Sequence, residues 1–192
     1  MKKALLVIDF INGIVRDGSC KAWANEHPIV GNTNKLIDAA RKRGIEIFFV
    51  RLAFDKNYTG CPKHSKMFNY VKSQGMFQLG NEDTDFIDAL DFHADHDTVI
   101  NKLGANPFAG NNLEQLLKEN DIEHLIFTGV ATENAIDIGV RYANDQGFYT
   151  TIVTDACGAA NKDLQTPILL ALERIANELI DTKTCLEQMS AN

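Results

Sequence analysis

The sequence predicts an α/β protein in which helices cover both faces of a mostly parallel sheet. Continuous apolar runs recur along the chain, and such runs are typical of parallel strands that are buried on both faces. Segments with helical spacing of apolar residues separate these runs. A regular alternation of strands and helices predicts right-handed crossover connections and a fold of three layers.

The chain opens with an apolar strand, residues 4–10, that carries an acid, Asp9, near its end. A helical pattern over residues 32–43 follows and stops at Gly44, a residue suited to ending a helix. The same reasoning predicts the remaining elements. They are strands at 45–54, 97–103, 125–127 and 149–154, and helices at 85–90, 112–120, from Thr132 onward and at 165–179.

One connection, residues 55–80, lacks a clear period and mixes aromatic, glycine and basic residues. Long irregular connections in compact proteins are often functional, so this segment is interpreted as a lid or a wall of the substrate site. The alternative is that its aromatic residues extend the core. Five residues in this part of the chain and in neighbouring loops are candidates for substrate binding: Asn12, Phe54, Tyr70, Phe77 and Phe108.

The 192-residue chain is expected to form one domain, residues 1–192, and it is long enough to bury a sizeable core. Its net charge of −7 argues against binding to nucleic acid or to an anionic membrane surface. No apolar run approaches the roughly 20 residues of a membrane span, and the first run is shorter than the core of a signal peptide. We therefore expect a cytoplasmic protein that acts on a small molecule.

The four cysteines, at positions 20, 61, 157 and 185, show neither a CxxC pair nor zinc-like spacing, and they are expected to be free thiols. His93 and His96 are close enough in sequence to suggest a metal site. A polar turn before the next strand explains the same residues, and we prefer that interpretation. The sequence therefore predicts no metal and no cofactor.

The stretch from Leu125 to Ile136 joins a buried strand to a helical pattern through small residues. Thr132 is placed as the N-cap of that helix, and Ala135 then falls in its first turn. Backbone N–H groups in a first turn lack partners within the helix, and they favour a nearby negative charge. A nucleophile at position 135 would be activated there, and an oxyanion beside it would be stabilised.

Three blocks of sequence match the pattern of one known family. Residues 129–136, Gly-Val-Ala-Thr-Glu-Asn-Ala-Ile, are similar to a signature Gly-Val-Ala-Thr-x-x-Cys-Val, with Ala135 in the place of a catalytic cysteine. Residues 4–12 resemble an opening strand with a catalytic aspartate, and residues 102–113 resemble a lysine block, with Asn111 in the place of threonine. On these blocks the chain resembles the isochorismatase-like cysteine hydrolases over nearly its whole length. The resemblance implies a Rossmann-like sheet of about six strands.

In that family the aspartate accepts the thiol proton, the lysine holds the site electrostatically, and the thiolate attacks a carbonyl or amidine-like carbon. The resemblance assigns the first two roles to Asp9 and Lys102. It places the oxyanion donors at the amides of Ala131 and Ala135. It also implies that the peptide bond before Ala131 is cis, and that the protein is a homo-oligomer, either a dimer or a tetramer.

Ala135 supplies no nucleophile, and three explanations compete. The favoured one is an inactive Cys-to-Ala variant of a hydrolase that cleaves a C–N bond in a small amide, lactam or urea-type substrate. The second is an enzyme that uses Asp9 as a general acid on a vinyl ether, as the true isochorismatases do without cysteine. The third is a non-catalytic protein that binds small molecules. A substitute thiol from Cys61 or Cys157 is less well supported, because neither matches the motif.

The second explanation makes a further demand, because isochorismate is a dianion and needs cations in its site. The available cations are Lys102, Arg51 and four lysines of the predicted lid, namely Lys56, Lys63, Lys66 and Lys72. The position of these side chains in the folded chain therefore tests that explanation.

Overall fold

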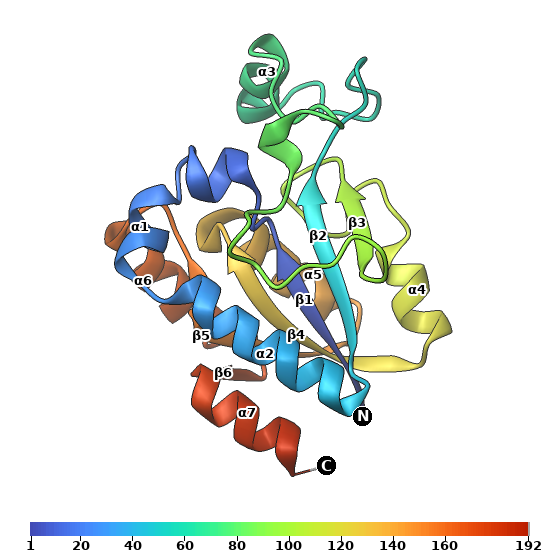
Figure 1. The fold of residues 1–192 in the computed structure, drawn as a ribbon, viewed down its shortest axis with the longest axis vertical. Helices are drawn as coiled ribbons and strands as arrows, with labels where there is room; N and C mark the ends of the chain where they lie inside the picture. Colours follow the sequence, from blue (N-terminus) through green and yellow to red (C-terminus); the bar gives the residue numbers. More distant parts are fainter. Residues whose placement is uncertain (192) are drawn as a thin grey trace.

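In the computed structural model, which describes residues 1–191, six parallel strands form one sheet in the order β3-β2-β1-β4-β5-β6 (Figure 1). The strands are β1 (Lys2–Ile8), β2 (Glu46–Leu52), β3 (Thr98–Lys102), β4 (Ile122–Val130), β5 (Tyr149–Gly158) and β6 (Glu178–Ile180). The strand order reverses between β1 and β4, and open α/β sheets bind ligands beyond the carboxyl ends of the strands at such a point. The predicted α/β fold with about six mostly parallel strands is confirmed.

Helices cover both faces of the sheet (Figure 1). One face carries α2 (Ile29–Arg43) and α7 (Thr182–Ser190), and the other carries α4 (Leu113–Glu119), α5 (Asp137–Asp145) and α6 (Lys162–Leu172). Shorter helical segments lie in the connections: η1 (Asn12–Arg16), α1 (Lys21–Glu26), α3 (Lys66–Ser73), η2 (Glu82–Thr84) and η3 (Thr132–Ile136). In the described part of the chain, every helix is too short or too polar to cross a membrane.

The alternation of side chains along β1 divides the core into two clusters. Leu5 and Val7 pack on the side of α2 and α7, whereas Leu6 and Ile8 pack on the side of α4, α5 and α6. All four are fully buried, and burial of one such side chain contributes about 1.5–3 kcal/mol. A strand covered on both faces needs apolar residues at every position, which explains the continuous run in the sequence.

β1 and β4 approach each other closely at Gly129. This residue has a φ of +127°, and a Cβ atom placed on it would lie 2.1 Å from the carbonyl oxygen of Ile8. Only glycine fits this conformation and this spacing. The close approach holds together the two strand ends that lead to Asp9 and to Ala131.

The helix predicted at residues 85–90 is wrong, because this segment forms a bridge at Phe86 and then a turn, in which Leu90 N donates to Ile87 O at 2.9 Å. It lies beside the chain that follows β1 and forms an isolated antiparallel bridge between Phe86 and Ile11. Phe86, Ile87 and Leu90 are buried against the core. Their spacing is compatible with a helix, but packing against the core selects the bridge and the turn.

The helix predicted at residues 165–179 is wrong at its C-terminal end. α6 stops at Leu172, a turn follows, and Glu178–Ile180 form the edge strand β6, which pairs with β5. A short edge strand can continue the apolar spacing of a helix, so periodicity alone does not separate the two. The last helix, α7, was not predicted, although Asp181 caps it by accepting a hydrogen bond from Thr184 N at 2.8 Å.

Residues 55–77 project beyond the carboxyl ends of β1 and β2 (Figure 1), and we call this segment the lid. It was predicted to be irregular but contains α3, whose first turn is capped by the Ser65 hydroxyl. Two backbone hydrogen bonds of 2.8 Å close its base, one from Phe54 N to Phe77 O and one from Leu79 N to Phe54 O. The lid is therefore a closed excursion from the end of β2.

Candidate active site

Asp9 lies directly beyond β1, at the reversal point of the sheet. Its φ of +57° is in the left-handed region, which aspartate adopts more readily than most residues, and it turns the chain away from the strand. Its Oδ1 accepts a hydrogen bond from the backbone N–H of Leu52 at 2.8 Å. Because the residue is only 2% exposed, its carboxylate needs a charged partner.

Lys102 is that partner. It is the last residue of β3, two strands away, and its Nζ lies 2.7 Å from Asp9 Oδ2. Two strand spacings are about 10 Å, so only a long side chain can reach across. Lys102 is also 2% exposed, and its Nζ donates a second hydrogen bond to Ala105 O at 2.9 Å. The structure thus brings together the two charged residues that the sequence singled out.

Burial controls the proton affinity of Asp9. Loss of hydration raises the pKa of the Asp9 carboxyl above its ordinary value. The charge of Lys102, its hydrogen bond, and the N–H of Leu52 act in the opposite direction and offset part of that rise. A carboxyl group with a raised pKa exchanges protons more easily near neutral pH, so Asp9 is suited to either general-base or general-acid chemistry.

The end of β4 supplies the third part of the site. The peptide bond between Val130 and Ala131 is cis, as the resemblance implies. A π-helical turn, η3, follows and carries Ala135, which is 2% exposed and faces the same cavity as Asp9 and Lys102. The predicted N-cap is wrong, because Ala131 occupies that place and the buried Thr132 hydroxyl has no hydrogen-bond partner within residues 1–191. The oxyanion role of Ala131 and Ala135 stays a prediction.

These groups line a cavity of about 330 Å³, within the range of small-molecule sites. The ends of the strands and the turns after them contribute Asp9, Leu52, Lys102, Ala105, Ala131, Asn134 and Ala135. The loop after β1 contributes Gly13, Ile14, Gly18 and Ser19. The lid contributes Met67, Phe68, Tyr70, Val71, Met76 and Phe77.

Two of the five predicted substrate-binding residues, Tyr70 and Phe77, line this cavity, and three do not. Asn12 turns away and donates from its side chain to Glu82 O at 3.0 Å. Phe54 is fully buried beneath the lid, where its ring packs against the rings of Tyr58 and Phe68. Phe108 belongs to the core cluster on the opposite side of the sheet and packs on Tyr142.

The sequence analysis missed the loop wall formed by Gly13, Ile14, Gly18 and Ser19. The paired glycines are the signal that could have revealed it, because the loop folds tightly on itself. A Cβ atom at Gly18 would lie 2.1 Å from Gly13 O. Such a tight loop directly after a strand with a catalytic candidate is a place where a site wall is expected.

The cations proposed for a dianionic ligand do not gather in the cavity. Arg51 binds the Asn101 side chain and the Thr84 carbonyl, at 2.9 and 3.0 Å. The lid lysines Lys56, Lys63, Lys66 and Lys72 are absent from the lining. Within residues 1–191, Lys102 is the one cationic side chain that lines the cavity, and it is already paired.

The cysteines considered as substitutes also lie elsewhere. Cys157 belongs to β5 and is buried in the core cluster on the side of α4, α5 and α6, with its Sγ near Phe127 O. Burial raises the pKa of its thiol to about 12. Cys61 lies in the lid, and partial burial raises the pKa of its thiol as well. Neither Cys61 nor Cys157 lines the cavity, so neither is placed to attack a ligand bound there.

The two histidines considered for a metal site belong to a surface turn. His93 contacts Asp91 at 2.9 Å, while Arg41 pairs with both Asp91 and Asp97. These carboxylates are therefore engaged by a guanidinium group. In the part of the chain that the structure describes, no three His, Cys, Asp or Glu side chains are placed to hold a metal ion.

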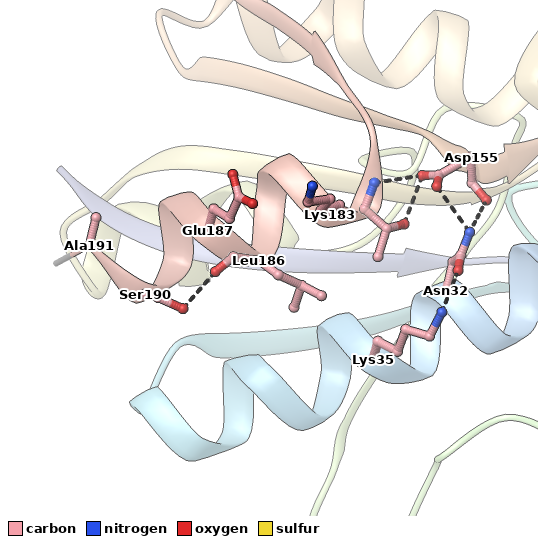
Figure 2. A pocket seen from close by; sticks show the side chains of 9 residues that line it. Asn32, Lys35, Asp155, Lys183, Leu186, Glu187, Ser190 and Ala191 are labelled. Carbon is pink, nitrogen blue, oxygen red and sulfur yellow. Dashed lines mark hydrogen bonds between the residues drawn. The ribbon is translucent and has the colours of Figure 1, made fainter.

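A second, larger hollow lies between the first half of α2 and the helix α7 (Figure 2). Its volume is about 660 Å³, and Asp155 lies at its edge. Asp155 Oδ1 accepts hydrogen bonds from the Thr182 N–H and hydroxyl, both at 2.7 Å, and Oδ2 accepts one from Asn32 at 3.1 Å. All of these donors are neutral, and they join β5, α2 and the start of α7.

The sequence model of the isochorismatase domain matches residues 3–184, which is nearly the whole chain. The chain belongs to the isochorismatase family. Two relatives in the isochorismatase family resemble it over most of both chains. The ureidoacrylate amidohydrolase of Yersinia enterocolitica is 28% identical over 200 residues, covering 94% of this chain and 86% of the relative. A probable inactive nicotinamidase of Arabidopsis thaliana is 26% identical over 178 residues, covering 90% and 88%.

Solved structures support the isochorismatase fold. An isochorismatase family protein from Desulfovibrio vulgaris superposes with a TM-score of 0.84 at 20% identity, and the match covers 100% of this chain and 99% of the other. Isochorismatase-family relatives thus include an amidohydrolase and a protein described as probably inactive. Their names set the range of functions to be weighed for this chain.

Proposed function

We propose that the cavity is the C–N hydrolase site of an isochorismatase-family protein in which Ala135 takes the place of the nucleophilic cysteine. As it stands, the chain binds a small amide, lactam or urea-type molecule but cannot cleave it through a covalent intermediate. The observation that carries this proposal is the buried Asp9–Lys102 pair, 2.7 Å apart, beside Ala135 in one cavity. No metal or cofactor is required.

With a thiol at position 135 the arrangement would perform acyl transfer in two steps. Asp9 would accept the thiol proton, a C–S bond would form at the carbonyl carbon, and the C–N bond would break as Asp9 returns the proton to the leaving amine. Water would then hydrolyse the thioester. Lys102 would keep the carboxylate ordered in a desolvated site, and the amides of Ala131 and Ala135 would face the oxyanion.

The relatives support both halves of this proposal. One is named as an amidohydrolase, which fits a site for C–N bonds. The other is named as a probable inactive nicotinamidase, which fits a chain without the nucleophile. Ala135 is interpreted as a Cys-to-Ala replacement, and the natural codon at position 135 would reveal whether it was introduced deliberately. Assembly into a dimer or a tetramer is part of the same proposal.

The test is the Ala135→Cys variant, assayed for release of ammonia or a free amine from small amides, ureas and lactams. The variant should show turnover that the unmodified chain lacks, because only the thiol is missing. Ala135→Ser is the matched control, since a hydroxyl of similar size is a much weaker nucleophile at neutral pH. Absence of any gain in Ala135→Cys, with folding intact, would contradict the proposal.

A second candidate function is cleavage of a vinyl ether with Asp9 as general acid, and the raised pKa of Asp9 favours it. The lack of a free cation in the lining disfavours it for a dianion, because Lys102 is already paired. Pyruvate release from isochorismate by the unmodified chain, abolished in Asp9→Asn, would establish this activity in place of the first.

A further inference from the structure

The cavity lining combines apolar residues, the neutral polar residues Ser19, Tyr70 and Asn134, and two charged residues. Most of the wall is apolar and comes from the lid and the loop after β1, through Ile14, Met67, Phe68, Val71, Met76 and Phe77. Within residues 1–191, the only charged side chains in the lining are Asp9 and Lys102. What the cavity accepts therefore depends on whether either charge is free.

Neither charge is free. The ammonium of Lys102 lies 2.7 Å from the carboxylate of Asp9, so the pair is neutral as a unit. A second Nζ hydrogen bond goes to Ala105 O, and Asp9 Oδ1 is taken by Leu52 N–H. A ligand carboxylate or ammonium would enter an apolar space without a counter-charge and would lose its hydration there.

The size of the cavity limits the ligand further. One water occupies about 30 Å³ of the liquid, so about 330 Å³ corresponds to a molecule with on the order of ten non-hydrogen atoms. Such a ligand places its reacting carbonyl at Asp9 and Ala135, and its remaining atoms extend toward the lid. Those atoms meet Phe68, Val71 and Met76, which offer apolar contacts.

The geometry points to an uncharged substrate, a small amide or urea whose non-reacting group is apolar. This inference rests on the proposed function and adds the substrate class to it. The apolar lid wall selects the non-reacting group, and the neutralised ion pair excludes ligands with a net charge. The lid, not the catalytic frame, is the element that sets this preference.

Two probes of similar size, one neutral and one anionic, test it with the unmodified chain, which binds without turnover. N-(3-methylbutyl)urea carries an isopropyl group where 3-ureidopropanoate carries a carboxylate of similar shape. Titration calorimetry should show the neutral urea binding at least about tenfold more tightly, which is a difference of about 1.4 kcal/mol. Equal affinities, tighter binding of the carboxylate, or no binding of the neutral urea up to its solubility would overturn the inference.

A lysine introduced at the cavity mouth should reverse the preference. Met67 lines the cavity and is 43% exposed, so Met67→Lys adds a cation at little cost in folding. Leu79→Lys is the matched control, because Leu79 is 47% exposed on a neighbouring segment but does not line the cavity. Met67→Lys should favour the carboxylate by at least about tenfold relative to Leu79→Lys; identical affinities in the two variants would overturn the inference.

Turnover by Ala135→Cys separates this inference from the proposed function. Tight binding of the neutral urea without release of ammonia would sustain the substrate class and contradict the hydrolase proposal. Faster hydrolysis of 3-ureidopropanoate than of the neutral urea would sustain the hydrolase proposal and contradict the substrate class.

Discussion

Two aspartates follow apolar strand segments in this molecule, each beside a hollow, and they differ in almost every other respect. Asp9 is 2% exposed and is paired with the ammonium of Lys102, whereas Asp155 is exposed and accepts hydrogen bonds only from the neutral groups described above. Asp9 faces a cavity of about 330 Å³, and Asp155 borders a groove twice as large.

The difference separates an acid that joins structural elements from one that we propose takes part in the chemistry. Asp155 joins three elements, and its oxygens are satisfied by donors that hold the start of α7 in place. Asp9 is held by a charge that must itself be buried, an expensive arrangement that structure alone does not require. The volume of a neighbouring hollow is a poor guide to function. A buried ion pair that lines a cavity is a better guide.

The strongest test of this contrast removes the cation. Lys102→Met should lower the free energy of unfolding by about 3–5 kcal/mol, because the Asp9 carboxylate would remain buried without a partner. In the Ala135→Cys background the same change should abolish turnover. Chemical denaturation and the ammonia assay measure the two effects.

Lys102→Arg serves as the charge-conserving control. The guanidinium group is planar and larger than an ammonium, so it should restore part of the stability but not the turnover. If Lys102→Met lowered the free energy of unfolding by less than about 1 kcal/mol, the Asp9–Lys102 pair would contribute no more than an exposed ion pair does. The proposed difference between Asp9 and Asp155 would then be lost.

The matching change at the groove should be milder. Asp155→Ala removes the carboxylate that accepts three hydrogen bonds, two from Thr182 and one from Asn32. The change should lower the free energy of unfolding by about 1–3 kcal/mol. Asp155→Asn keeps one acceptor oxygen and should cost less than Asp155→Ala. Neither change should alter the affinity of N-(3-methylbutyl)urea measured by calorimetry, and a change in that affinity would show that the two regions are coupled.

The smallest expected effect is in the pH dependence. Burial holds the pKa of Asp9 above its ordinary value, and loss of Lys102 raises it further. Between the pKa of Asp9 in the unfolded chain and its higher pKa in the folded variant, the folded variant binds more protons than the unfolded chain. The stability contributed by this protonation is therefore present at low pH and is lost as the pH rises through the folded-state pKa of Asp9. The loss in free energy of unfolding caused by Lys102→Met should therefore be smaller in mildly acidic than in mildly alkaline buffer. Denaturation curves at several pH values measure this, and a constant deficit would contradict a buried carboxylate.

The sequence predicted the parallel sheet because a strand such as β1 must be apolar at every position to be covered on both faces. It failed where a pattern has two solutions. Residues 85–90 and the edge strand β6 carry apolar spacings that suit a helix as well as an extended segment, and only the surrounding packing decides between them.

The same distinction applies to the site. A charged residue at the end of an apolar run is unusual, but position alone also fits a capping role for Asp9 and a solvent-directed side chain for Lys102. The family resemblance assigned both to the site, and the structure pairs them. Aromatic residues carry no such directional signal. Phe54 and Phe108 are core residues, while Phe77 and Tyr70 face the cavity, and sequence spacing does not tell these cases apart.

The closed base of the lid has a consequence for engineering. The ends of residues 55–77 are joined through Phe54 by two hydrogen bonds of 2.8 Å, so the segment leaves and rejoins the sheet at nearly one point. Doubling the length of a loop with fixed ends costs only about 0.6 kcal/mol in closure entropy. Lids of other lengths and compositions could therefore be transplanted between Phe54 and Gln78, and a library of such chimaeras would diversify selectivity while the ion pair beneath stays constant.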